Sequence, residues 1–297
     1  MGMPPDLPVL DTYMNVPMRQ KRAQYLFMHR QLKDDDSKEM EFPAEYMFKD
    51  HPTDREDTED WDPVAYIVDA MDRCGVAQAL ILADPDSKHF AETERALTTH
   101  PDRFLLGSAN FDPNDVMGTL RRIERHVTEH DVKMIQFFPS GNHPQVPIND
   151  PKMYAAYAKC VELGVPVAVC AGVPGPRLPM MAQHVEHIDE VMYDFPELVL
   201  ITRHGCEPWE ELMVKLMLKW PNLYYSTSAF APKHYPRAII DFANTRGADK
   251  VIYAGYFPDG LSLDRIFAEM PHVPFRDHVW PKFLHENARR VLGLPTP

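Results

Sequence analysis

The chain has 297 residues and a formal net charge of −13, from 31 Lys and Arg against 44 Asp and Glu. This charge disfavours binding to nucleic acid or to an anionic membrane through bulk electrostatics. No segment approaches the ~18 consecutive apolar residues of a membrane span, no basic and apolar signal sequence opens the chain, and the four cysteines show neither CxxC nor CxxH spacing. We therefore expect a cytoplasmic protein without a disulfide framework or a zinc knuckle.

Short apolar segments alternate with longer helical ones, which is typical of βα units around a parallel sheet. The expected strands are 8–13, 78–83, 104–111, 133–138, 165–172, 198–205, 223–228 and 250–257. The expected helices are 63–74, 88–100, 114–130, 151–163, 183–194, 208–220, 236–244 and 261–269, with a last helix over 281–292. This pattern predicts an α/β protein, a single (β/α)8 TIM barrel domain over 1–297 with a C-terminal helix.

Several of the expected helices have recognisable first turns. Pro63 and Pro208 suit the first helical position, where the missing N–H is not needed. Asp62, Asp115 and the pair Asn149/Asp150 are the expected N-caps, because their side chains accept a backbone N–H of the first turn.

Residues 16–61 fit no βα unit and are rich in Met, Arg, His and acidic residues. An insertion after the first strand lies at the carboxyl-terminal mouth of a barrel, so we expect a lid or an oligomer contact. The alternative is a disordered loop, against which the aromatic content of the segment argues.

The ends of the expected strands carry polar and aromatic side chains. Active residues of a TIM barrel come from the carboxyl ends of its strands. The residues at these ends are Tyr13, Asn15, Gln136, Phe138, Cys170, His204, Ser226, Ser228 and Tyr256.

Short motifs occur in order along nearly the whole chain, and together they are specific although each alone is weak. They are Leu10–Asn15, Asp72–Val76, His100–Phe104, Asn149–Pro151, Glu162–Val167, His204–Trp209 and Glu286–Gly293. With these motifs the chain resembles the amidohydrolase superfamily, in the amidohydrolase-related group of aminocarboxymuconate semialdehyde decarboxylase and the resorcylate-type decarboxylases.

The resemblance implies a zinc-type site with His-x-His on strand one, a His on strand five, often a His on strand six and an Asp on strand eight. These positions fall on Tyr13, Asn15, Cys170, His204 and Tyr256, and only His204 keeps the residue type of the family. We therefore expect no catalytic metal and no other cofactor. The alternative is one metal in an atypical Cys/His/Asn site, although Cys170 and His204 give two ligands where a catalytic zinc site has about three.

The replacements suggest chemistry of their own. Strands one and eight are neighbours in a closed barrel, so Tyr13 and Tyr256 are expected to lie close together and to donate to developing negative charge. The alternative is that the two phenols plug a defunct pocket. His204 is the expected general acid/base, because its pKa suits proton transfer near neutrality, or else a hydrogen-bonded structural histidine.

Cys170 ends the strand next to that of His204, so the two form a nucleophile/base pair or Cys170 is a small apolar filler. Arg177 follows strand five on a loop stiffened by proline and glycine, where it either anchors a substrate carboxylate or braces the loop in a salt bridge.

Five further residues, Trp209 among them, complete the expected substrate pocket. Asn15 and Gln136 are expected to form hydrogen bonds with the substrate, and Phe138 to form a wall. Glu207, beside Trp209, either supports the site or belongs to the first turn of a helix, where acidic residues are favoured.

The resemblance and these residues together predict a metal-independent hydrolase or carbon–carbon lyase of the decarboxylase type. Its substrate would be a small carboxylated or aromatic metabolite, and the family implies a homo-oligomer, a dimer or a tetramer. The alternative is an inactive barrel that serves as partner subunit of an active homologue.

Overall fold

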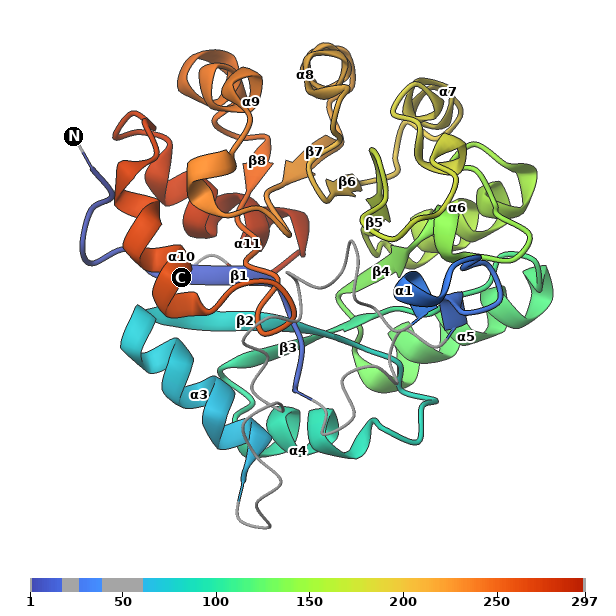
Figure 1. The fold of residues 1–297 in the computed structure, drawn as a ribbon, viewed down its shortest axis with the longest axis horizontal. Coiled ribbons are helices and arrows are strands. Elements are labelled where there is room, and N and C mark those ends of the chain that lie inside the picture. The colour runs from blue at the N-terminus through green and yellow to red at the C-terminus, as the bar shows by residue number, and fades with distance from the viewer. Residues whose placement is uncertain (1, 18–26, 39–60, 296–297) are drawn as a thin grey trace.

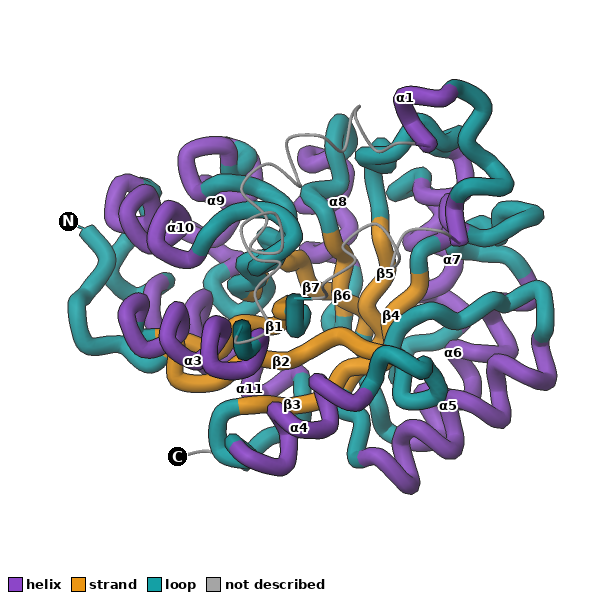
Figure 2. Tube along the Cα trace, turned by 60° about the horizontal axis from the view of Figure 1, so that its bottom comes forward, coloured by secondary structure: helices purple, strands orange, loops and turns teal. Residues whose placement is uncertain are grey.

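The computed structural model describes residues 2–17, 27–38 and 61–295 as one barrel. Eight strands form a single parallel sheet in which each strand pairs with the next in sequence. Helices cover the outside of this sheet (Figures 1 and 2). An isolated parallel bridge between Met14 and Phe257 brings the segment after the last strand back to the first. The predicted (β/α)8 TIM barrel is confirmed.

All eight expected strands are present; the first is shifted by one residue, the second begins two residues earlier than expected, and the other six are shorter. The strands are β1 Val9–Met14, β2 Val76–Ala83, β3 Phe104–Ser108, β4 Met134–Phe137, β5 Val167–Cys170, β6 Leu200–Arg203, β7 Leu223–Ser226 and β8 Val251–Ile252. The helices are α1 Asp35–Lys38, α3 Pro63–Cys74, α4 Ala91–Thr99, α5 Val116–His130, α6 Pro151–Leu163, α7 His187–Asp194, α8 Glu210–Lys219, α9 Arg237–Phe242, α10 Leu263–Glu269 and α11 Asn287–Val291. None of the described helices is both long and apolar enough to cross a membrane.

The first turns of three helices are capped as predicted. The side chains of Asp62, Asp115 and Asp150 each accept a backbone N–H from the first turn of α3, α5 and α6. The prediction for Pro208 is wrong, because α8 begins at Glu210 and not at the proline. The last expected helix is a π-helical turn, Lys282–Glu286, continued by α11.

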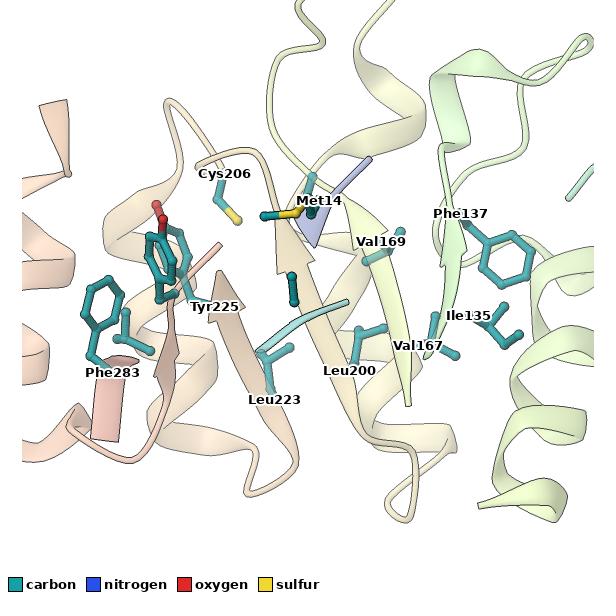
Figure 3. Packing of buried hydrophobic residues seen from close by; sticks show 14 of the residues in the cluster. Met14, Ile135, Phe137, Val167, Val169, Leu200, Cys206, Leu223, Tyr225 and Phe283 are labelled. Carbon is teal, nitrogen blue, oxygen red and sulfur yellow. The ribbon is translucent and has the colours of Figure 1, made fainter. Parts of the chain in front are cut away.

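Two apolar layers fill the barrel and its surroundings. Alternate strand residues such as Leu80 and Ile201 meet inside the barrel in one cluster. The intervening residues, such as Val167 and Leu200, face outward and pack with the helices in a larger cluster (Figure 3). Each fully buried aliphatic side chain contributes about 1.5–3 kcal/mol, so the core holds the strand ends in fixed positions.

The barrel closes between β1 and the irregular segment that follows β8. Thr12 Oγ1 donates to the carbonyl of Tyr253 at 2.8 Å. The backbone N–H of Tyr256 donates to the carbonyl of Tyr13 at 3.1 Å. Because β8 itself has only two residues, these bonds fix where Tyr13 and Tyr256 lie.

Asp11 ties the same two segments together from inside the protein. Its Oδ1 accepts the backbone N–H of Tyr13 and of Gly255, both at 2.9 Å, and the residue is fully buried. Burial raises the pKa of Asp11 to about 7, although the bonds from Gly255 and Tyr13 lower it. The carboxyl group is therefore partly protonated near neutral pH.

We predict that Asp11 makes the protein less stable as the pH rises from about 4 to about 7. A folded-state pKa above the unfolded value means that the folded protein binds more protons in this window. The free energy of unfolding then falls by at most about 1.4 kcal/mol per pH unit. Asp11→Asn removes this dependence, and urea unfolding at several pH values measures it. Asp6→Asn, on the surface, is the control, and equal slopes for Asp11→Asn and the native protein would contradict the prediction.

Candidate active site

Three aromatic rings meet at the carboxyl-terminal mouth of the barrel. The rings of Tyr13 and Tyr256 are stacked, with centroids 4.5 Å apart and an interplanar angle of 19°. The His204 ring meets Tyr256 edge-on at 5.1 Å and Tyr13 at 6.2 Å. The expected proximity of the two tyrosines is therefore confirmed, and His204 lies against both.

A buried arginine, which the sequence analysis did not select, joins this group. Arg203 is the last residue of β6 and only 2% of its surface is exposed. Its guanidinium carbon lies 3.9 Å from the centroid of the Tyr13 ring, and its Nη2 lies 3.2 Å from His204 Nε2. The sequence did contain a signal for it. Arg203 follows Ile201 by two positions, and alternate residues of a strand face the same side, which here is the barrel interior.

The contacts of His204 define its protonation. A guanidinium can only donate, so Nε2 accepts from Arg203 and the ring proton belongs on Nδ1, which lies 3.3 Å from the Ser228 hydroxyl. Burial and then the charge of Arg203 hold the pKa of His204 well below 6.5. The imidazole is therefore neutral at pH 7.

Two of the site residues have unusual backbone conformations. His204 and Tyr256 both have a φ of 64°, in the left-handed region that residues with a side chain rarely adopt. Each such residue costs about 1–3 kcal/mol and persists only where its neighbours impose the conformation, and such strain concentrates at functional sites. Here the Ser228 hydroxyl accepts from the His204 backbone N–H at 3.1 Å.

Asn15 is held by a second residue that the sequence analysis missed. Its side-chain N–H donates to the carboxylate of Asp259, of which 1% is exposed. Burial raises the pKa of Tyr13, Arg203 lowers it, and Asp259 raises it again. A positive and a negative group thus act on the Tyr13 phenol together.

Cys170 lies beside Arg203, its register partner across β5 and β6. Burial raises the pKa of the Cys170 thiol, while the charge of Arg203 and a hydrogen bond with Gln136 lower it. Among the described residues, Cys170 thus interacts with Arg203 and Gln136 rather than with His204. The thiol is protonated at neutral pH, which favours the role of a small buried filler.

Arg177 forms an ion pair at 2.6 Å with Asp34, so the loop-bracing alternative describes its position. The Phe138 ring meets Phe27 edge-on at 6.3 Å. These contacts place the described residues 27–38 of the insertion on the loops after β4 and β5. Most of the insertion lies outside the described residues, so its role as a lid stays a prediction.

Glu207 and Trp209 lie on the connection from β6 to α8. Glu207 is exposed, and its carbonyl accepts the backbone N–H of Val173 at 2.8 Å. The Trp209 ring packs on His184, with centroids 4.1 Å apart. Both residues therefore have structural contacts away from the three-ring group, and their expected substrate contacts stay predictions.

The side chains at the metal position of the family do not fit a divalent cation. Arg203 places a fixed positive charge 3.2 Å from the His204 nitrogen that would bind the metal. The Cys170 thiol is protonated, and Tyr13 and Asn15, where the resemblance implies a His-x-His pair, offer a phenol and an amide. Like charges at such a distance repel strongly in a buried site, so this donor set disfavours a metal.

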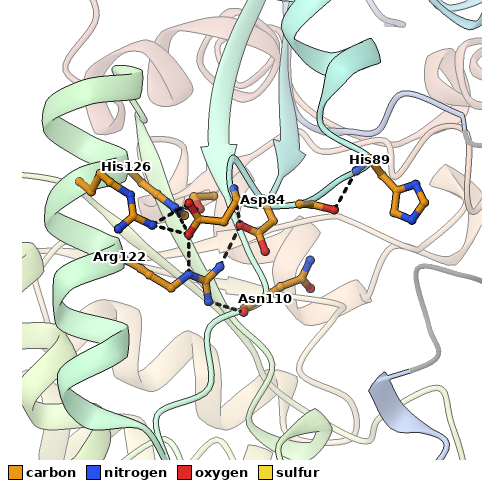
Figure 4. A network of polar contacts seen from close by, with 9 residues as sticks. Asp84, His89, Asn110, Arg122 and His126 are labelled. Atoms are coloured by element: carbon orange, nitrogen blue, oxygen red, sulfur yellow. Dashed lines mark hydrogen bonds and ion pairs between the residues drawn. The ribbon is translucent and has the colours of Figure 1, made fainter.

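A second group of possible metal ligands lies after β2 and on α5 (Figure 4). Atoms of Asp84, Asp86 and His126 lie within 4.8 Å of one another. Arg122 contacts Asp84 at 2.8 Å and Asp86 at 3.0 Å, and Arg125 contacts Asp86 at 2.5 Å. A cation would have to break these ion pairs.

The histidine of this network is equally engaged. His126 Nδ1 lies 2.8 Å from Ser108 Oγ and Nε2 lies 3.0 Å from Asp86. Burial raises the pKa of Asp86, but the hydrogen bonds from Arg125, His126 and Arg122 lower it by more, so that the pKa is about 2. The group thus forms an internally paired network.

Comparison with known proteins assigns the family. A sequence profile of the amidohydrolase family matches residues 27–294. The chain belongs to this family. None of the curated proteins compared with this amidohydrolase matches it in sequence.

Solved structures share the fold at low sequence identity. An uncharacterised TIM-barrel protein from Bordetella bronchiseptica is 19% identical with a TM-score of 0.71, covering 97% of this chain and 99% of its own. The 5-carboxyvanillate decarboxylase of Novosphingobium aromaticivorans is 16% identical with a TM-score of 0.64, covering 97% and 96%. A dihydroxybenzoic acid decarboxylase from a Polaromonas species is 14% identical with a TM-score of 0.63, covering 98% of both chains.

Both decarboxylase structures contain manganese. The expected absence of a metal from this amidohydrolase is therefore not supported by its structural neighbours and stays a prediction.

We predict that the Tyr13 ring, more than its hydroxyl, stabilises the mouth. Tyr13→Phe keeps the stacking on Tyr256 and Arg203, and is expected to lower the free energy of unfolding by about 1 kcal/mol. Tyr13→Ala removes the ring and is expected to cost about 3–5 kcal/mol. Urea unfolding of both variants measures the difference, and equal losses would show that the ring is not packed as described.

Proposed function

We propose that this amidohydrolase-family protein is an enzyme that uses His204 as acid/base, without a metal at the family position. Its substrate is a small carboxylated or aromatic metabolite, and its reaction is hydrolysis or cleavage of a carbon–carbon bond. The manganese-containing neighbours that are named as aromatic acid decarboxylases support the substrate class.

The observation that carries the proposal is the environment of the His204 ring. The imidazole is neutral, its Nδ1 is oriented by Ser228, and its Nε2 lone pair lies in the polar group with Arg203. A neutral imidazole in a fixed orientation is a competent base, and donors around it stabilise developing negative charge.

Because the His204 imidazole is neutral before the substrate reacts, it is suited to act as a base in the first step. In hydrolysis, the attacking water replaces Arg203 as the donor to His204 Nε2, which takes the water proton and returns it to the leaving group. In decarboxylation, a protonated His204 delivers a proton to the carbon that loses carbon dioxide, so protonation must come first. The depressed pKa makes the hydrolytic order the easier of the two.

The inactive-partner alternative lacks a comparable observation. A barrel without chemistry has no need to keep His204 and Tyr256 in the left-handed backbone region. It equally has no need to bury an arginine beside them.

We predict that His204→Gln lowers turnover at least about 100-fold, because general acid–base catalysis contributes about 10²–10⁴-fold. The measurement is a screen of lactones, amides and hydroxybenzoates that carry a carboxylate, followed by kinetics on the hits. His272→Gln, on an exposed turn, is the control with full turnover. Undiminished turnover in His204→Gln would contradict the role of His204. No turnover of any compound by the native protein would contradict the proposal as a whole and favour the inactive partner.

We predict that the protein purified without added metal contains much less than one zinc or manganese ion per chain. Turnover of a screening hit should then be unchanged by a chelator. Elemental analysis checks the first point. A stoichiometric metal would refute metal independence, and its loss in Asp86→Asn would assign it to the Asp84–Asp86–His126 network.

A further inference from the structure

Arg203 has donors that no described residue uses. Its Nε and Nη1 are shielded from solvent and have no hydrogen-bond partner among the described residues, while Nη2 contacts His204. A buried donor without a partner destabilises the folded protein, and more strongly when it is charged. Such a group in a folded protein needs an explanation.

No carboxylate of the described part of the chain neutralises this arginine in an ion pair. Arg122 and Arg177, by contrast, are paired with Asp84 and Asp34 at 2.8 and 2.6 Å. The charge of Arg203 acts instead on Tyr13, Cys170 and His204. At pH 7 the phenol and the thiol are protonated and the imidazole is neutral, so none of the three carries a charge. Among the described residues, Arg203 is therefore a buried cation without an ion-pair partner, although the carboxylate of Asp259 acts on the same Tyr13 phenol.

We infer that Arg203 is the anion-binding residue of the barrel mouth and holds a carboxylate of the substrate. The inference rests on the proposed function, because only an enzyme has a substrate. Arg203 takes the place of Arg177 as the expected carboxylate anchor. Arg203 would thus supply, from the chain itself, a positive charge where the family places its metal.

The geometry of the guanidinium fits this role. Tyr13 covers one face of the group, which leaves the in-plane N–H edges for hydrogen bonds. Nη2 carries a second hydrogen, so it can complete a two-bond edge with either Nε or Nη1. His204 is only partly buried, so an anion approaches from its side and displaces the side chains that now shield Nε and Nη1.

A consequence for the chemistry follows. A carboxylate held by Arg203 is stabilised in the ground state, which opposes its own loss as carbon dioxide. The bond that breaks therefore belongs to another part of the substrate, such as an ester, an amide or a second carboxyl group.

The test compares carboxylates with neutral analogues of the same shape, using formate against formamide and benzoate against benzamide. Thermal unfolding and calorimetric titration are measured on the native protein, Arg203→Met, Arg203→Lys and the control Arg237→Met, whose arginine pairs with Asp241 on the surface of α9. A saturating carboxylate is expected to raise the Tm of the native protein and of Arg237→Met by about 2 °C or more, and the amides to leave it unchanged.

Arg203→Met is expected to lose this stabilisation and to weaken carboxylate affinity at least about tenfold. Without ligand, its Tm should equal or exceed that of the native protein, because an unpaired buried charge has been removed. Arg203→Lys keeps the charge and should retain part of the effect, which also covers the case in which Arg203→Met does not fold.

The inference is overturned if neither carboxylate stabilises the native protein, if the amides act equally, or if Arg203→Met keeps the full effect. Loss of the effect in Arg177→Met alone would return the anchor to Arg177. Carboxylate binding at Arg203 without any turnover would refute the proposed function and leave this inference standing. Turnover that needs His204 but is insensitive to Arg203→Met would refute this inference and leave the proposed function standing.

Discussion

The arrangement of the barrel mouth depends on one contact, the Arg203 guanidinium on the face of Tyr13. The cation can remain buried there because the aromatic face and His204 Nε2 take over part of its solvation. The Tyr13 ring is also stacked on Tyr256, and the positive charge of Arg203 lies beside His204. The neutral state of the imidazole follows from burial and from this charge, whereas the neighbouring Cys170 thiol stays protonated because burial outweighs the charge.

A guanidinium and a metal ion solve the same problem in different ways. Both place positive charge where a substrate oxygen would develop negative charge, but the guanidinium acts through directional hydrogen bonds and needs no ligand set. On the proposed function, this would account for the phenols of Tyr13 and Tyr256 and the amide of Asn15 at positions where the resemblance implies metal ligands. The barrel accommodates the two phenols, because Tyr13 and Tyr256 pack in the apolar cluster inside it.

The sequence predicted what local patterns determine. Apolar alternation placed all eight strands, and the caps Asp62, Asp115 and Asp150 needed only their neighbours in the chain. Arg203 was missed because its own strand was expected to end at residue 205, two residues later than it does, so that His204 alone was selected from it. Asp259 was missed because it becomes part of the site only through barrel closure, which brings it to Asn15 across 244 positions.

The most direct measurement is a crystal structure of the protein grown with manganese, with anomalous diffraction recorded at the metal edge. The account predicts no anomalous peak at the barrel mouth and an Arg203 guanidinium stacked on Tyr13. A peak bound by His204 and Cys170, with Arg203 turned away from Tyr13, would contradict it.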